Sequence, residues 1–269
     1  MTALALAAGW PTEADGGVRP VLVEADGSGG DLMIRFGLPT APSLLDVAAA
    51  AGQAYPGSLL GAASELPCGV RVVVSVPGRG PCREAVRLLA GEPGRRVLLG
   101  DERDRGTVVL DVGRLTGDVE PLVEAADQVV LVARGGAEPL THVSAYGMDV
   151  DAYGGRLTLA VVGPCPYPAA EIEKSLGIER VVFLPWDAKS VAAMNSPQPT
   201  VPRTRGFRPP PLMATAQALA RRLAMVQETG ATAEGSDGDR VSGAVGARLG
   251  ERPVRTGLVQ VPGVEGSGS

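Results

Sequence analysis

Aromatic residues are scarce in this sequence: Phe, Trp and Tyr together make up 3% of its 269 residues. Proteins that bind single-stranded nucleic acid stack its bases on aromatic side chains, so the shortage argues against such binding as the main function. The formal net charge is −5, which provides no overall basic surface for a phosphate backbone. We therefore expect no direct readout of nucleic-acid bases.

Cysteine, histidine and lysine are rare as well. The cysteines are odd in number and widely spaced, which argues against a disulfide framework and favours a reducing cytoplasm. With a single histidine, a zinc site built from His and Cys is not expected. Basic charge is carried almost entirely by Arg. The residues in question are Cys68, Cys82, Cys165, His142, Lys174 and Lys189.

Long hydrophobic runs are also missing, since none reaches the roughly 18 residues of a membrane span. The apolar start (1–10) has no positive segment before it and no small-residue cleavage site after it, so a signal peptide is not expected. No basic amphipathic helix follows the last predicted helix, so we expect no autonomous membrane anchor. Recruitment to the membrane or the cell pole would need a partner.

Short runs of β-branched and aliphatic residues recur through the first two thirds of the chain. They are continuous rather than alternating, which is typical of strands buried on both faces of a parallel sheet. Helix-like stretches lie between them, so the sequence predicts a doubly wound α/β fold with a mainly parallel sheet. The predicted strands are 21–23, 70–76, 96–99, 107–110, 128–133, 157–162 and 181–184. The predicted helices are 43–54, 82–91, 119–126, 137–147, 169–177 and 212–227.

One domain, 1–228, accounts for all these elements, with a Pro/Arg-rich loop at 196–211 inside it. Its basic residues Arg203, Arg205 and Arg208 could contact phosphate or acidic lipid, although a solvated loop is favoured. The remainder, 229–269, is rich in Gly, Ser, Ala and charge, and the sequence predicts a disordered tail there.

Acidic residues follow three of the predicted strands. Ligands of open α/β sheets bind beyond the carboxyl ends of the strands, and Mg²⁺ takes only one or two carboxylates and keeps several waters. Taken singly, an Asp at such a place more often caps a turn or a helix, and we expect this role for Asp31. The three places are Glu24-Ala25-Asp26 with its following glycines, Asp111, and Pro185-Trp186-Asp187.

The order of these motifs resembles the MinD/ParA group of deviant Walker-type ATPases, which have a P-loop NTPase-like fold. Glu24-Ala25-Asp26 is similar to the group's Asp-x-Asp segment, Asp111 to its Walker B aspartate, and Pro185-Trp186-Asp187 to its nucleotide-base turn. The resemblance covers about residues 1–195. A weaker likeness, which includes Ser43 to Val47, is to MinD-like proteins of Tad/Flp-type pilus assembly and secretion systems.

The departure from the group lies at the start of the chain. Met1 to Ala8 resembles the helix that follows the group's phosphate loop, while the first strand, the glycine-rich loop and its lysines do not precede it. Thr2 is similar to a hydroxyl residue at the end of that loop, and Cys165 stands where the group has an adenine-reading Asn. Without the loop we expect weak ATP binding, and without the strand we expect unpaired sheet edges.

Within this resemblance, ATP and Mg²⁺ are the implied cofactors and ATP hydrolysis the implied activity. Asp26 would orient the attacking water, Asp111 would hold Mg²⁺ through water with Thr2 near the metal, and Pro185 and Asp187 would contact the nucleotide. The implied function is spatial organisation: chromosome or septum positioning, or pilus or secretion assembly. The implied partners are a second copy of the chain and an assembly or secretion ATPase, and loss of the loop lysine puts nucleotide-controlled dimerisation in doubt.

Two explanations of the departure stay open: a start codon assigned downstream of the true one, or a nucleotide-independent relative. In the second case the chain would be a catalytically inert scaffold that docks a partner assembly ATPase. A dinucleotide-binding oxidoreductase is disfavoured, because residues 27–30 do not supply a Gly-x-Gly-x-x-Gly turn.

Overall fold

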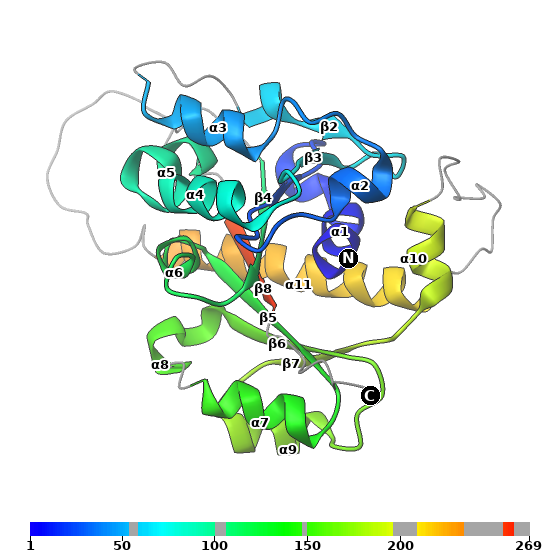
Figure 1. Cartoon of the computed structure of the whole chain (residues 1–269). Helices are drawn as coiled ribbons and strands as arrows, with labels where there is room; N and C mark the ends of the chain where they lie inside the picture. Colours follow the sequence, from blue (N-terminus) through cyan, green and yellow to red (C-terminus); the bar gives the residue numbers. More distant parts are fainter. Residues whose placement is uncertain (54–58, 100–105, 147–149, 196–208, 234–254, 261–269) are drawn as a thin grey trace, which may run out of the picture.

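The computed structural model describes residues 1–53, 59–99, 106–146, 150–195, 209–233 and 255–260. These residues form three layers, with a twisted eight-stranded sheet between two layers of helices (Figure 1). This confirms the predicted doubly wound α/β fold. Among the described residues, no helix has the length and apolar character needed to cross a membrane.

The strand order is β2-β3-β1-β4-β8-β5-β6-β7. All neighbouring strands run parallel except β2, which pairs antiparallel with β3. The strands are β1 (Val21–Glu24), β2 (Ser64–Glu65), β3 (Arg71–Val73), β4 (Val108–Arg114), β5 (Gln128–Arg134), β6 (Leu157–Val162), β7 (Val181–Leu184) and β8 (Arg255–Gln260).

Strand β8 occupies the middle of the sheet although it comes from the far end of the chain. Its backbone pairs with β4 on one side, with Asp111 opposite Leu258, and with β5 on the other, with Val132 opposite Gln260. The prediction of an unpaired central edge is therefore wrong. The predicted disordered tail is wrong at 255–260, and also at 229–233, which continue helix α11; the ranges 234–254 and 261–269 lie outside the described residues.

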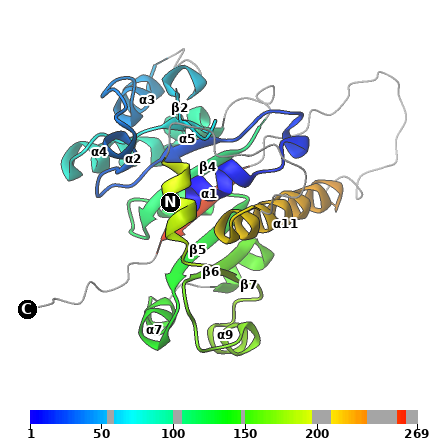
Figure 2. The same cartoon turned by 90° about the vertical axis from the view of Figure 1, so that its right-hand side faces the viewer.

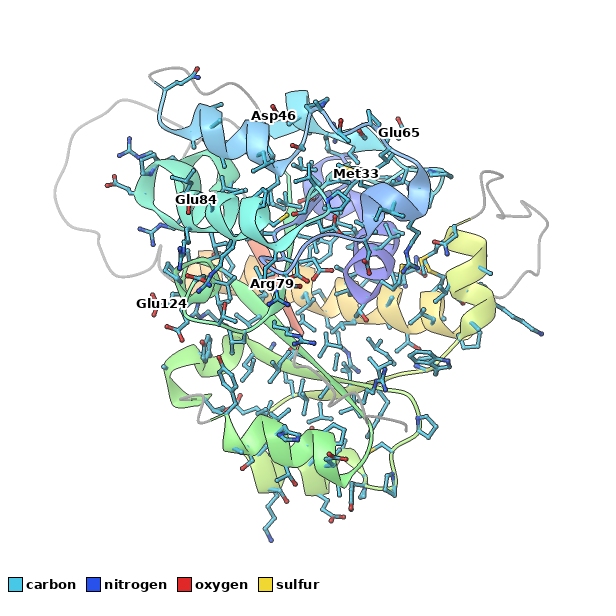
Figure 3. All side chains as sticks on the ribbon, in the orientation of Figure 1. Met33, Asp46, Glu65, Arg79, Glu84 and Glu124 are labelled. Atoms are coloured by element: carbon cyan, nitrogen blue, oxygen red, sulfur yellow. The ribbon has the colours of Figure 1, made fainter. Side chains whose placement is uncertain are left out.

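One face of the sheet is covered by helices that pack on alternate strand residues such as Val21 and Val23. This layer contains α3 (Leu44–Ala51), α4 (Arg79–Ala90), α5 (Glu92–Leu99), α6 (Glu120–Glu124), α7 (Ala137–Ala145), α8 (Val150–Tyr153) and α9 (Ala169–Leu176). Single 3-10 turns are η1 (Thr12–Asp15), η2 (Leu59–Ala62) and η3 (Gly154–Arg156). Helix α3 begins with a capping box between Ser43 and Asp46, the latter labelled in Figure 3.

The other face is covered by α1 (Thr2–Gly9), α2 (Leu32–Phe36), α10 (Ala188–Met194) and α11 (Pro211–Ala233). Helix α1 lies between the sheet and α11, so all its Ala and Leu side chains except the partly buried Ala8 are buried (Figure 2). The two helices approach closely at Gly9, where a Cβ would lie 3.1 Å from the Cα of Gln217. This packing fixes the start of α1 relative to the strands.

The run 96–99 is the one predicted strand that forms a helix instead. It is the end of α5, in which Val97 and Leu98 are buried and an ion pair joins Arg96 to Glu92 one turn earlier. A short apolar run does not distinguish a strand from one face of a helix, which explains the error. The other predicted strands and helices are present, with boundaries shifted by a few residues.

Candidate functional site

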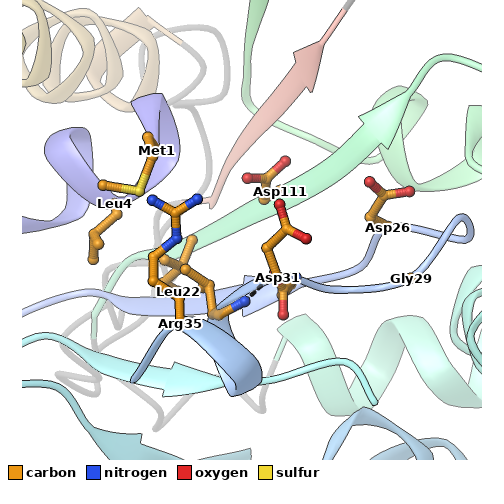
Figure 4. A pocket seen from close by; sticks show the side chains of 10 residues that line it. Met1, Leu4, Leu22, Asp26, Gly29, Asp31, Arg35 and Asp111 are labelled. Atoms are coloured by element: carbon orange, nitrogen blue, oxygen red, sulfur yellow. Dashed lines mark hydrogen bonds between the residues drawn. The ribbon is translucent and has the colours of Figure 1, made fainter. Parts of the chain in front are cut away.

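The carboxyl ends of β1 and β4 meet beside the start of α1, where they enclose a small cavity (Figure 4). The two strands are neighbours in the sheet, and their pairing places Glu24 opposite Asp111. The cavity has a volume of about 90 Å³. Its lining residues are Met1, Leu4, Leu22, Glu24, Asp26, Gly29, Asp31, Leu32, Arg35 and Asp111. The predicted carboxylates Asp26 and Asp111 therefore share one cavity.

Asp26 is held in place by the turn that follows β1. Its Oδ1 accepts hydrogen bonds from the backbone N–H of Ser28 at 2.8 Å and from the Ser28 hydroxyl at 2.7 Å. Its carboxylate also packs against β4, because a Cβ added to Gly113 would lie 2.2 Å from the Asp26 Cγ. Gly113 has a φ of +64°, so a glycine is required both for the backbone and for this contact.

Glu24 organises the glycine-rich turn rather than pointing freely into the cavity. Its Oε1 accepts from the backbone N–H groups of Asp31 (2.8 Å) and Leu32 (3.1 Å), and its Oε2 accepts from Ser75 (3.2 Å). Burial raises the pKa of this carboxyl above its usual range, while the three N–H donors oppose the increase. Glu24 therefore links β1, the start of α2 and the end of β3.

Asp31 stands at the N-cap position of α2, as expected, but its side chain makes no capping hydrogen bond. Glu24 fills that role from the strand, which leaves the Asp31 side chain free to face the cavity beside Asp111 (Figure 4). The expectation that Asp31 caps the helix through its side chain is therefore wrong. Sequence alone did not show this, because the capping acceptor lies seven residues earlier.

Asp111 lies on β4 with two other carboxylates, Asp26 and Asp31, in the same cavity wall. Its Oδ1 accepts only a long hydrogen bond, 3.3 Å, from the N–H of Gly113. Burial raises the pKa of its carboxyl, and the nearby charges of Asp26 and Asp31 raise it further, against the opposing effect of the Met1 amino group. A divalent cation would relieve this repulsion, and Mg²⁺ needs only one or two protein carboxylates.

The described residues contain no group of three or more His, Cys, Asp or Glu side chains that could hold a metal alone. A cation at Asp111 would therefore keep most of its ligands as water or as oxygens of a second molecule. This fits the cofactor implied by the sequence, a magnesium ion bound together with phosphate. Arg35 adds a basic side chain to the same wall.

Helix α1 begins at the cavity, with Met1 and Leu4 in its wall. Thr2 is the first residue of α1 and is not among the lining side chains. The first backbone N–H groups of a helix have no partner inside it, and they attract anions. The cavity thus has a helix N-terminus on one side and carboxylates on the other.

The third predicted motif lies apart from this cavity. Pro185 and Asp187 follow β7, which is four strand positions from β4, or roughly 19 Å at the usual spacing. The Asp187 carboxylate accepts from the N–H groups of Lys189 and Ser190 and from the Ser190 hydroxyl, so it caps α10. These hydrogen bonds lower its pKa. Asp187 has a structural role in this structure, and the cavity does not include it.

The remaining candidates are scattered. His142 is exposed on α7, in agreement with a surface histidine, and Cys165 is a half-exposed free thiol that packs on the first core layer. Arg203, Arg205 and Arg208 lie outside the described residues. The sequence analysis did not identify the contact of Gly113 with Asp26 or the strand β8. The available signals were a Gly two residues after Asp111 and the apolar pair Leu258-Val259.

Comparisons with known proteins identify the fold. No family model and no curated protein matches the chain. Among solved structures, a ParA family ATPase from Chlorobium tepidum is similar with a TM-score of 0.58 and 15% identity, over 81% of this chain and 91% of that one. The cell division ATPase MinD of Pyrococcus furiosus has a TM-score of 0.57 and 18% identity, over 84% and 93%. MinD of Pyrococcus horikoshii, solved with Mg-ADP, has a TM-score of 0.55 and 18% identity, over 86% and 89%.

Proposed function

We propose that this protein binds a magnesium-nucleotide complex, ATP or ADP, at the cavity between β1, β4 and α1, and uses nucleotide turnover as a switch. The observation that carries the proposal is the register of Glu24 opposite Asp111, which brings Asp26, Asp31 and Asp111 to the start of one helix. The similarity in fold to MinD and ParA ATPases supports it, as does the Mg-ADP bound by one of those proteins.

Each side chain has a role that its surroundings allow. Asp111 would hold Mg²⁺ through water, and that ion would neutralise phosphate charge. Asp26, fixed by Ser28 and Gly113, would orient an attacking water molecule or respond to the terminal phosphate. Thr2, at the start of α1, would lie near the metal. Glu24 is a positioning residue, because it holds the turn that carries Asp26 and Asp31.

The biological role follows by analogy and remains part of the proposal. The solved structures of this fold include a cell division ATPase and a septum site-determining protein. We propose a role of the same kind for this chain, in spatial organisation: chromosome or septum positioning, or assembly of a pilus or secretion system. A second copy of the chain and an assembly or secretion ATPase are the partners we propose, with the protein in the cytoplasm.

The alternative is an inert scaffold for a partner ATPase. Two observations favour it. The lysines, Lys174 and Lys189, lie far from α1 in the sequence. Asp187, implied as a nucleotide contact, caps helix α10. The observation against it is the convergence of Asp26, Asp31 and Asp111 on one small cavity, because partly buried like charges destabilise a scaffold that gains nothing from them. Nucleotide binding separates the two.

The test is the thermal stability of the full chain with Mg-ADP and Mg-ATP, followed by calorimetry. A ligand at a free concentration 100 times its Kd raises the free energy of unfolding by about 2.7 kcal/mol, which corresponds to an increase of several degrees in Tm. The variant Asp111→Asn should reduce the shift, while Glu84→Gln, on the exposed surface of α4 (Figure 3), should leave it unchanged. No shift at millimolar nucleotide in the unmodified chain would overturn the proposal and favour the scaffold.

A further inference from the structure

Helix α4 begins beside the turn that carries Asp26. The turn approaches the helix so closely that a Cβ added to Gly27 would lie 3.6 Å from the Cα of Arg83. A Cβ added to Gly29 would lie 3.2 Å from the backbone nitrogen of Gly78, the residue before the helix. Glycines allow two backbones to approach in this way. The turn that fixes Asp26 therefore rests on the start of α4.

The opposite side of α4 is anchored in the protein interior. Ala85, Val86 and Leu89 belong to the hydrophobic core on one face of the sheet. The thiol of the buried Cys82 donates a hydrogen bond to the carbonyl of Val76 at 2.8 Å. Because these contacts hold the helix against the sheet, α4 is a fixed support for the segments that lean on it.

Arg83 also reaches the loop that follows β4. Its Nε donates to Oδ2 of Asp118 at 2.6 Å, and the Nε of Arg87 donates to Oδ1 at 2.8 Å. Asp118 lies between β4 and α6, and α6 is a neighbour of α4 in the same layer (Figure 1). Hydrogen bonds from Arg87 and Arg83 hold the pKa of the Asp118 carboxyl below its usual range, so this carboxylate is ionised at neutral pH.

These contacts close a ring around Asp26. Strand β4 carries Asp111 in the cavity wall and Gly113 against the Asp26 carboxylate. The loop after this strand is held by Arg83, and the backbone of Arg83 contacts the turn in which Asp26 lies. One residue of α4 thus joins the two segments that determine where Asp26 lies relative to Asp111.

We propose that Arg83 is a positioning residue of the candidate site, which holds the Asp26 turn and the loop after β4 in register with each other. The inference rests on the proposed function, in which Asp26 orients an attacking water molecule. Arg83 is not among the residues that line the cavity, so it acts through Asp26 and not by contact with a nucleotide. Its role belongs to turnover, whereas nucleotide binding depends on the cavity itself.

The effect of Arg83 should be local. Its side chain is about half exposed, and exposed ion pairs contribute little to the free energy of unfolding. The amide of Ser28 is a suitable reporter, because it donates to Oδ1 of Asp26 at 2.8 Å. Its NMR order parameter measures how rigidly the Asp26 turn is held.

The experiment uses full-length proteins: the unmodified chain, Arg83→Gln, Asp118→Asn, the conservative variant Arg83→Lys and the control Glu92→Gln. Glu92 forms an exposed ion pair with Arg96 on α5, so the control removes a bond of the same kind at another place. NMR relaxation gives the Ser28 order parameter, steady-state ATP hydrolysis gives kcat, and calorimetry gives the Kd for Mg-ADP.

We expect Arg83→Gln and Asp118→Asn to lower the Ser28 order parameter from the rigid value of about 0.85 toward the flexible range below about 0.6. Their kcat should fall by about tenfold, because a small displacement of a catalytic group is costly, while the Kd for Mg-ADP stays within about twofold. Arg83→Lys should recover most of the kcat, since Arg83 donates to Asp118 through a single nitrogen. The control Glu92→Gln should match the unmodified chain in all three measurements.

An unchanged order parameter or an unchanged kcat in Arg83→Gln and Asp118→Asn would overturn the inference and leave the proposed function standing. A Kd for Mg-ADP that rises as much as kcat falls would also overturn it, because Arg83 would then act on binding. If the unmodified chain binds neither nucleotide, the proposed function is wrong. The Ser28 order parameter then decides alone whether Arg83 holds Asp26 in place.

Discussion

At the scale of single residues, Gly113 has the most constrained place in the candidate site. The φ of +64° disfavours any side chain, and a Cβ would lie 2.2 Å from the Asp26 Cγ, so Asp26 would have to move. Asp26 owes its position to this contact and to the two hydrogen bonds from Ser28. The candidate site therefore depends on a residue that bears no functional group.

The variant Gly113→Ala should lose about 1–3 kcal/mol of unfolding free energy because of the left-handed backbone and the displaced Asp26. The matched variant Gly117→Ala has open space around its Cβ and should stay within about 1 kcal/mol of the unmodified chain. Urea unfolding measures both. Equal stabilities of the two variants would show that Asp26 does not pack against Gly113.

For Asp111 we predict the opposite effect to that of Gly113→Ala: removing its charge should stabilise the protein. Its pKa is raised in the folded state, so the folded protein binds this proton more tightly than the unfolded chain does. The corresponding stability is present in full below the ordinary pKa of 3.8 and is lost as pH rises through the higher folded pKa. At neutral pH the ionised carboxylate therefore lowers the stability.

Asp111→Asn should accordingly unfold at higher urea concentration than the unmodified chain at pH 7, by on the order of 1 kcal/mol, without nucleotide and with EDTA present. The difference should shrink as the pH falls toward 4. Surface control Glu84→Gln should show neither effect. A less stable Asp111→Asn protein at pH 7 would mean that the carboxylate is satisfied in the fold and has no need of a cation.

At the scale of helices and strands, local patterns predicted most elements but not their roles. The runs 128–133 and 157–162 are strands because a strand buried on both faces has a continuous apolar sequence, and that signal is local. The prediction of a strand at 96–99 was wrong because an amphipathic helix with two adjacent buried residues has the same short apolar run as a strand. The prediction that Asp31 caps α2 was wrong because the capping acceptor, Glu24, comes from another element, strand β1.

The largest miss, β8, has a physical cause. A composition rich in Gly, Ser and charge indicates that a segment cannot build a core by itself, and this holds for 229–269 as a whole. Residues 255–260, however, form a strand between β4 and β5, and the backbone N–H and C=O groups of both neighbours pair with it. Such a strand derives its order from its neighbours, so its own sequence carries little of the signal.

At the scale of the whole molecule, β8 brings distant parts of the sequence together. It lies between β4 and β5, and it runs parallel to both (Figures 1 and 2). Its carboxyl end therefore lies at the sheet edge where Asp111 lines the cavity, and α1 begins at the same cavity. Elements that meet at one edge of a sheet can be joined in a new order along the chain.

A permutant in which a 20-residue Gly/Ser linker joins Ser269 to Met1, and the chain is opened between Gly243 and Ala244, should fold to the same structure, because β8 ends and α1 begins at the same edge of the sheet. We expect its Tm, measured by thermal unfolding, to stay within a few degrees of that of the unmodified chain, since the loop-closure cost grows only slowly with loop length. The comparison protein is the chain shortened to residues 1–243, which lacks β8. It should be clearly less stable, because β4 and β5 would then be left with unpaired backbone groups. A shortened chain as stable as the permutant would show that β8 does not hold the two halves of the sheet together.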